Sequence, residues 1–274
     1  MARRPLTSLV VGRILLRGAS GLSFALILMP IVFVSWLSFF KNELLTFPPG
    51  GYTLRWFWVM WQQSQFADGF VTSLEVGLLA MAGGLVLGIP ASLGLARLEF
   101  RGKELATTLL TAPLIVPGIV IGTALFLSFV ELELLTELPL VGSVVGLALG
   151  HILITIPWTV RLITAGLAGF DRAIEEAAMN LGADRWTTLV KVTLPMIRPA
   201  IVAAALFSFV VSFENLEISL FLVAPGETTL PIAILQYVEW KIDPTIAAVS
   251  LVQIAIIAAG LLLSNRFVKL SQVV

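Results

Sequence analysis

The sequence contains no cysteine and only one histidine, His151, in 274 residues. The absence of cysteine excludes disulfide bonds and thiolate metal sites, and one histidine cannot form a histidine-rich metal centre. We therefore predict no metal site. Charged residues make up 12% of the chain, against about a quarter in an ordinary soluble domain. Basic and acidic residues number 17 each, so the net charge gives no reason to expect a nucleic-acid partner.

The sequence also lacks the motifs of nucleotide-binding and hydrolytic enzymes. There is no G-x-x-x-x-G-K-[ST] phosphate loop, and the RGKE stretch at 101–104 does not have its spacing. There is no G-x-S-x-G motif and no His-Glu zinc helix. We therefore expect a chain that is not an enzyme, binds no cofactor and cannot hydrolyse ATP by itself.

Apolar residues, in contrast, are abundant: they form 58% of the chain, and the mean hydropathy is +1.00. A membrane-spanning helix needs about 20 predominantly apolar residues. We predict an all-α integral membrane protein, with a short amphipathic cytoplasmic segment over 1–19 and a single transmembrane domain over 20–274. The six predicted spans are 20–40, 70–95, 107–130, 140–164, 198–223 and 245–266.

The basic residues are distributed unevenly among the loops between these spans. If the N-terminus is cytoplasmic, 14 of the 17 basic residues lie on the cytoplasmic side, and Lys41, Arg55 and Lys241 lie outside. Because cytoplasmic loops are enriched in basic residues, we predict that both termini are cytoplasmic. Residues 165–197 then form the largest cytoplasmic loop. The aromatic-rich stretch 41–69 would lie at the outer membrane interface.

The loop at 165–197 carries signals for short helices. Asp171 is suited to cap a helix over about 172–181, and Gly182 is suited to the left-handed position that follows it. We expect a helix, a glycine bend and a second helix on the cytoplasmic surface, shaped to be bound by another protein. The alternative is an amphipathic loop that packs on its own helix bundle.

The second half of the loop has its own boundary signals. Asp184 can cap the second short helix. We expect Pro195 to end that helix, and Pro199 to lie in the first turn of the next span.

This loop resembles the EAA loop of permease subunits of ATP-binding-cassette (ABC) importers, and we call residues 165–197 the EAA segment. The family pattern is EAA, three residues, G, nine residues and I-x-L-P. The chain has EAA at 176–178, glycine at 182 and V-T-L-P at 192–195, with valine in place of isoleucine. The resemblance implies that this loop sits in a groove of an ATPase subunit and passes its closure to the membrane helices. The implied coupling residues are Glu176, Ala177, Ala178, Gly182, Ala183, Leu194 and Pro195.

Further stretches are similar to the PotC-like permeases of polyamine uptake systems, a branch of the same family. They are TSLEVGLLAMAGGLVLGIPASLGLARLEFRGKE (72–104), LLTAPLIVPGIVIGTALF (109–126) and the run from Phe207 to Ser250. The resemblance implies a type I ABC importer permease fold in the bacterial inner membrane. It also implies a cationic cargo such as putrescine or spermidine. Other cargoes within this class are amino-acid derivatives, phosphonates and iron.

The same resemblance implies a set of partners. They are a second, homologous permease subunit, two cytoplasmic ATP-binding subunits that hold ATP and Mg²⁺, and an external solute-binding protein.

Acidic residues occur inside the predicted fifth span. Glu214 lies about nine residues, or roughly 13 Å at helical rise, from the outer end of the span, where a charge costs about 2.5–3.5 kcal/mol. Glu217 follows three residues later, so a continuous helix would place both acids on one face. We interpret them, with Ser212 and Asn215, as part of a cation-attracting pathway. The alternatives are an acid that stays protonated, or one that pairs with a helix of a partner subunit.

Three other residues of the predicted spans are candidates for a role. Trp158 follows Pro157 and could contact an ammonium group through its ring, or could pack as an ordinary apolar residue. Glu75 is either a residue at the mouth of the pathway or one that snorkels to the interface. We interpret His151 as structural.

Two other classes of function compete with an importer subunit. An ion-driven secondary carrier is favoured by internal repeats with discontinuous helices, and no convincing repeat relates the two halves. A membrane-embedded protease needs an assisted nucleophile or a pair of acids. Glu214 and Glu217 form the only close pair in a span, and no neighbouring residue in the sequence assists them.

Overall fold

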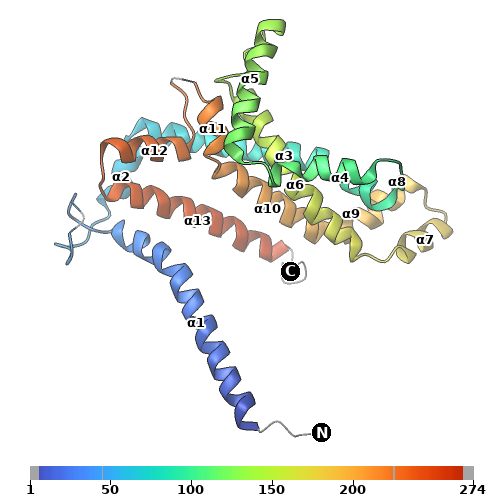
Figure 1. Cartoon of the computed structure of the whole chain (residues 1–274), viewed down its shortest axis with the longest axis horizontal. Coiled ribbons are helices and arrows are strands. Elements are labelled where there is room, and N and C mark those ends of the chain that lie inside the picture. The colour runs from blue at the N-terminus through green and yellow to red at the C-terminus, as the bar shows by residue number, and fades with distance from the viewer. Residues whose placement is uncertain (1–5, 45, 225, 268–274) are drawn as a thin grey trace. The chain divides into compact units, whose positions relative to one another are not determined.

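The computed structural model describes residues 6–44, 46–224 and 226–267, and nearly all of them lie in helices or turns. The extended pairing within these residues amounts to an isolated bridge between Phe40 and Tyr52. The prediction of an all-α protein is therefore confirmed (Figure 1). The described residues form two compact units: the first lies within 1–62 and 237–254, and the second lies within 63–236 and 255–274.

The first unit contains α1 (Leu6–Leu37) and α2 (Arg55–Gln62). Helix α1 is continuous from the predicted N-terminal amphipathic segment into the first predicted span. Arginine is a good helix former, so the arginines near the N-terminus do not interrupt the helix. The stretch between α1 and α2 is anchored by Trp56, whose buried indole N–H donates to the carbonyl oxygen of Phe40 at 2.6 Å.

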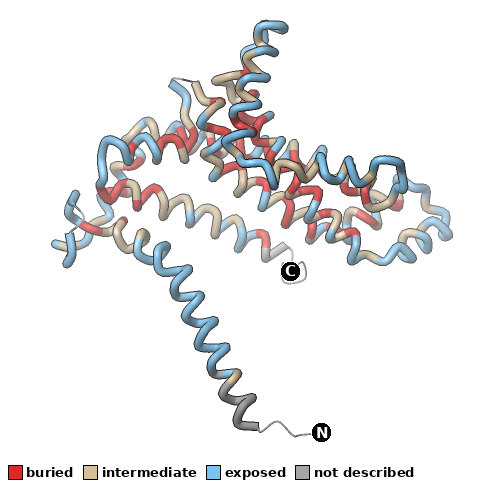
Figure 2. The backbone as a smooth tube through the Cα atoms, in the orientation of Figure 1, coloured by how far each residue is buried: buried red, intermediate tan, exposed pale blue. Residues whose placement is uncertain are grey.

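The second unit is built around α3 (Ser64–Arg97), α6 (Val144–Ala168) and α10 (Arg198–Phe213), which pack against one another. Figure 2 shows buried positions along these helices. Helix α3 approaches α6 closely at Gly84 and Gly88, where an added Cβ would collide with the side chains of Thr155 and Thr159. Small residues of this kind let two membrane helices approach closely.

The predicted third span, 107–130, is interrupted in the structure. Helix α4 (Lys103–Thr111) and a 3₁₀ turn (Ala112–Leu114) precede α5 (Gly118–Thr136). Pro113 lies in the turn and Pro117 directly precedes α5. Proline has no N–H for a helical hydrogen bond, so the apolar run divides at these two residues.

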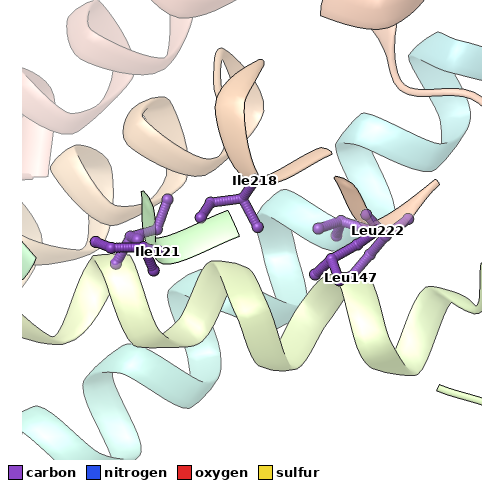
Figure 3. Packing of buried hydrophobic residues seen from close by; sticks show 6 residues of the cluster. Ile121, Leu147, Ile218 and Leu222 are labelled. Carbon is purple, nitrogen blue, oxygen red and sulfur yellow. The ribbon is translucent and has the colours of Figure 1, made fainter. Parts of the chain in front are cut away.

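The predicted fifth span, 198–223, is also divided. Helix α10 ends at Phe213, and α11 begins at Glu217 and ends at Leu222. Figure 3 shows how α11 is held: Ile218 and Leu222 lie in one apolar cluster with Ile121 of α5 and Leu147 of α6. The break is therefore followed by a well-packed helix.

Five helices in the described residues are long and apolar enough to cross a membrane, or six if one bent pair counts as a span. The bent pair is Arg185–Met196 with Arg198–Phe213, at 69°. The last two helices are α12 (Leu230–Trp240) and α13 (Pro244–Phe267). The prediction of a multi-pass membrane protein is confirmed. The five spans are Leu15–Leu37, Ser64–Arg97, Gly118–Thr136, Val144–Ala168 and Pro244–Ser264.

Candidate coupling segment and membrane pathway

The EAA segment forms the two short helices that its sequence predicts. Helix α7 (Ala173–Asn180) is followed by Gly182 with φ of 95°, and then by α8 (Arg185–Thr188). The Asp184 carboxylate accepts the backbone N–H of Thr187 at 3.2 Å, and hydrogen bonds from Thr187 hold the pKa of Asp184 below its ordinary value. Before α7, the Asp171 carboxylate accepts the N–H of Ala173 at 2.9 Å.

The expected helix end at Pro195 is wrong. The chain continues from α8 through a π-turn (Leu189–Thr193) into α9 (Leu194–Met196), and the helix axis bends only at Ile197. Pro195 is the second residue of α9 and directly follows the π-turn within this continuous run. Pro199 lies in the first turn of α10, as predicted. The wider π-turn is a feature often found at functional sites.

The predicted coupling residues lie mostly on the surface. Glu176, Ala177, Gly182 and Pro195 are exposed, while Ala178, Ala183 and Leu194 are half-buried. Two large apolar side chains beside them are also exposed: Leu181 at 91% and Trp186 at 70%. Because the charged residues Asp184 and Arg185 lie between Leu181 and Trp186, the surface suits contact with a protein better than contact with lipid.

Sequence reasoning missed the residue that anchors this segment. The Glu175 carboxylate lies 2.8 Å from the Arg97 guanidinium at the end of α3, and both side chains are largely buried, at 16% and 19% exposure. The Thr193 hydroxyl donates to the same carboxylate oxygen at 2.6 Å. These groups border a groove of about 570 Å³. The doubled glutamate at 175–176 was the available signal, but no sequence spacing connects it to Arg97.

The break between α10 and α11 overturns one prediction about the acids. Glu214 follows the last residue of α10 and Glu217 begins α11, so they do not share a face of one continuous helix. Asn215 explains the break, because its side-chain oxygen accepts the N–H of Ile218 at 2.8 Å and caps α11. Both glutamates are exposed.

His151 joins the two sides of this break. It is buried, and its Nδ1 lies 2.7 Å from the Ser212 hydroxyl at the end of α10. Its Nε2 lies 3.3 Å from the Ser219 hydroxyl in α11. Ser212, a predicted pathway residue, is thus buried in a hydrogen-bonded contact.

Trp158 stacks on Phe207 of α10, with ring centroids 5.6 Å apart and planes inclined by 23°. Phe207, which sequence reasoning did not single out, is 46% exposed. It lies seven residues before Glu214, so the two positions lie on nearly the same side of the helix axis. The aromatic pair and this acid thus follow one side of α10. Glu75 is exposed on α3.

Glu217, the first residue of α11, lies beside Gly118 at the start of α5. A Cβ added at Gly118 would overlap its carboxylate. The two glutamates therefore lie on opposite sides of the helix break, and their role in the pathway stays a prediction.

Comparison with known proteins gives consistent matches. The family model described as "Binding-protein-dependent transport system inner membrane component" matches residues 84–272. The chain is 31% identical to the putrescine transport system permease protein PotI of Escherichia coli K12, over 84% of this chain and 82% of that protein. It is 26% identical to the spermidine/putrescine transport system permease protein PotC of the same organism, over 88% and 89%.

Among solved structures, the fold is similar to that of a bacterial ABC transporter involved in the import of the acidic polysaccharide alginate. The TM-score is 0.71 at 14% sequence identity, with 97% of this chain and 99% of that chain covered.

Proposed function

This chain belongs to the family of binding-protein-dependent transport system inner membrane components, and we propose that it forms half of the translocation pathway of an ATP-driven importer for a small organic cation. The chain has the type I ABC importer permease fold and is a non-catalytic permease subunit of the bacterial inner membrane.

The exposed helix–glycine–helix surface of the EAA segment carries this proposal. Its apolar residues Leu181 and Trp186 are too exposed to stabilise the chain itself, so a partner that buries them accounts for their presence. That partner is one of two cytoplasmic ATPase subunits, which hold ATP and Mg²⁺. The EAA segment and both termini then face the cytoplasm.

The bend at Ile197 supports a route for coupling. The helical run from Arg185 to Met196 meets α10 at 69°. A movement imposed on the EAA segment would therefore tilt α10, which carries Phe207 and is followed directly by Glu214. Closure of the ATPase subunits thereby changes the access to the side of α10 on which these residues lie. A second permease subunit completes the pathway, and an external solute-binding protein delivers the cargo.

Two features favour a small cation such as putrescine or spermidine as cargo. An aromatic face attracts an ammonium group, and Phe207, which stacks on Trp158 and is 46% exposed, can offer such a face. Glu214 supplies an acidic group on the same side of α10. The relatives PotI and PotC are named as putrescine and spermidine/putrescine permeases. Aromatic and acidic groups together suit a flexible polyamine better than a phosphonate.

Uptake of labelled putrescine by the complete importer in proteoliposomes tests the cargo. Glu214→Gln should lower uptake about tenfold, because it removes a charge that a cation meets, while the complex still assembles. Glu104→Gln, at an exposed acid of α4, is the matched control and should transport normally. Equal uptake by both variants would contradict the role of Glu214. If unlabelled putrescine fails to compete while another solute does, the cargo is wrong and the permease assignment stands.

A further inference from the structure

We propose that Arg97 and Glu175 are positioning residues that fasten the EAA segment to the end of α3, so that a partner pulling on α7 moves α3 together with α10. This inference rests on the proposed function, since it takes the EAA segment as the place where the ATPase subunit acts. It adds a second, non-covalent route from that segment into the helix core.

The contact is concentrated on a single carboxylate oxygen. Glu175 Oε1 accepts from the Arg97 guanidinium at 2.8 Å and from the Thr193 hydroxyl at 2.6 Å. Arg97 is the last residue of α3, Glu175 lies in the first turn of α7, and Thr193 closes the π-turn. One atom therefore connects three elements.

Further contacts hold the same two elements together. The Arg172 guanidinium donates to the carbonyl oxygen of Ala96 at 2.5 Å, and the Arg97 guanidinium lies 5.7 Å from the centre of the Phe170 ring. Both contacts join the last turn of α3 to the stretch that leads into α7. The end of α3 is thus held by a hydrogen bond and a cation–π contact in addition to the ion pair.

The charges suit the helix ends on which they lie. A cation is favoured at the C-terminal end of a helix, as Arg97 is on α3, and an anion in the first turn, as Glu175 is on α7. Both side chains are largely buried, so removal of one charge leaves the other poorly solvated. The pair should therefore be harder to separate than an ordinary surface ion pair.

This link matters because the chain itself does not connect the EAA segment to α3. The segment continues directly from α6 and into α10, whereas Arg97 and Glu175 are 78 positions apart. Helix α3 in turn packs tightly on α6 at Gly84 and Gly88. With the ion pair in place, α3, α6 and α10 respond to the EAA segment as one body.

Parallel measurement of uptake and ATP hydrolysis tests the proposal. In the complete importer, Arg97→Gln and Glu175→Gln should keep most of the ATPase activity that the binding protein stimulates, while the transport per ATP falls about 3- to 30-fold. The charge-swapped variant, Arg97→Glu with Glu175→Arg, should recover most of that ratio. Lys103→Gln breaks an ion pair with the highly exposed Glu99 and should leave the ratio unchanged. The proposal would be overturned if both single variants transported as much solute per ATP as the wild type. It would also be overturned if the charge-swapped variant did not recover transport per ATP.

A distance measurement on a chain that keeps Arg97 and Glu175 makes the proposal testable even if the charge variants assemble poorly. The chain has no cysteine, so spin labels can be placed at Leu98, beside Arg97, and at Ile174 of α7, which are 60% and 42% exposed. We expect the same distance between the labels in the nucleotide-free and ATP-bound importer. A distance that changes with nucleotide would overturn the proposal.

Capture of the ATPase subunits separates this failure from a failure of the proposed function. Glu175→Gln should still co-purify with them. If the wild-type chain captures no ATPase subunit, the proposed function itself fails. If capture is normal while the label distance changes with nucleotide, only the role of Arg97 and Glu175 fails.

Discussion

His151 Nδ1 lies 2.7 Å from the hydroxyl oxygen of Ser212, so α6 is hydrogen-bonded to the last turn of α10 just before the helix breaks. The other ring nitrogen reaches Ser219 on the far side of the break. A neutral imidazole has one donor and one acceptor, which matches two hydroxyl partners. The break is therefore a fixed feature of the fold, held from α6.

His151→Ala should destabilise the protein by about 1–3 kcal/mol, because it leaves buried hydroxyl groups with fewer partners and opens a cavity. The measurement is thermal unfolding in detergent. Leu149→Ala is the control, since Leu149 lies on the same helix and is 47% exposed. Equal melting temperatures for the two variants would show that the hydrogen bonds of His151 contribute nothing to stability.

Gly182→Ala should weaken the binding of the ATPase subunits through backbone strain alone. Gly182 has φ of 95°, and an added Cβ would meet nothing within 4 Å, so steric collision is not involved. A side chain at positive φ costs about 1 kcal/mol, or roughly a fivefold loss of affinity. Gly260→Ala, also in open space but within a helix, is the control. Unchanged affinity on titration of the ATPase subunits would contradict the prediction.

Gly88→Ala should destabilise the packing of α3 on α6 by about 1–3 kcal/mol, because the new methyl group would overlap Thr159. Gly94→Ala lies on the same helix with no atom within 4 Å of the added Cβ, so it should be neutral or mildly stabilising. Chemical unfolding of both variants checks the difference. The packing account fails if Gly94→Ala loses as much stability as Gly88→Ala.

Asp243 should make the stability of the first unit depend on pH. Burial alone would raise its pKa, but hydrogen bonds from Lys241, Thr245 and Tyr237 hold the pKa below the ordinary value. A carboxylate with a lowered pKa in the folded state stabilises the fold above its unfolded pKa of about 3.9. That contribution is lost as the pH falls through the folded pKa.

We therefore expect Asp243→Asn to destabilise the chain by about 1–3 kcal/mol at neutral pH. The difference from the wild type should shrink as the pH falls below about 4. Unfolding midpoints at a series of pH values measure this, and a difference that stays constant down to pH 3 would contradict the assigned role of Asp243.

The parts of the fold that sequence predicted best rest on local signals. Asp184 and Gly182 act where the capping rules place them, because an N-cap and a left-handed glycine depend on their immediate neighbours. The lengths of the apolar runs identified the membrane helices because these, too, are properties of a continuous stretch of sequence. The local proline rule failed at Pro195, because the π-turn before it lets the helical run continue to Met196.

The parts that sequence did not predict depend on contacts between distant segments. The break at 214–216 relies on the Asn215 cap and on His151 in another helix. Composition does not report such contacts, so the sequence predicted one span over 198–223. Arg97 and Glu175 meet across 78 positions, and no periodicity reports such a pair. Phe207 became a candidate only once it was seen stacked on Trp158.

Site-specific cross-linking in the assembled complex tests the central claim most directly. In this cysteine-free chain, one cysteine at Leu181 can carry a photoreactive group, and one at Leu134 serves as the control. Both positions are highly exposed, at 91% and 76%, but Leu134 lies on α5 and outside the EAA segment. We expect position 181 to cross-link to an ATPase subunit and position 134 to give no such product. A product from position 134 alone, or none from position 181, would contradict the account.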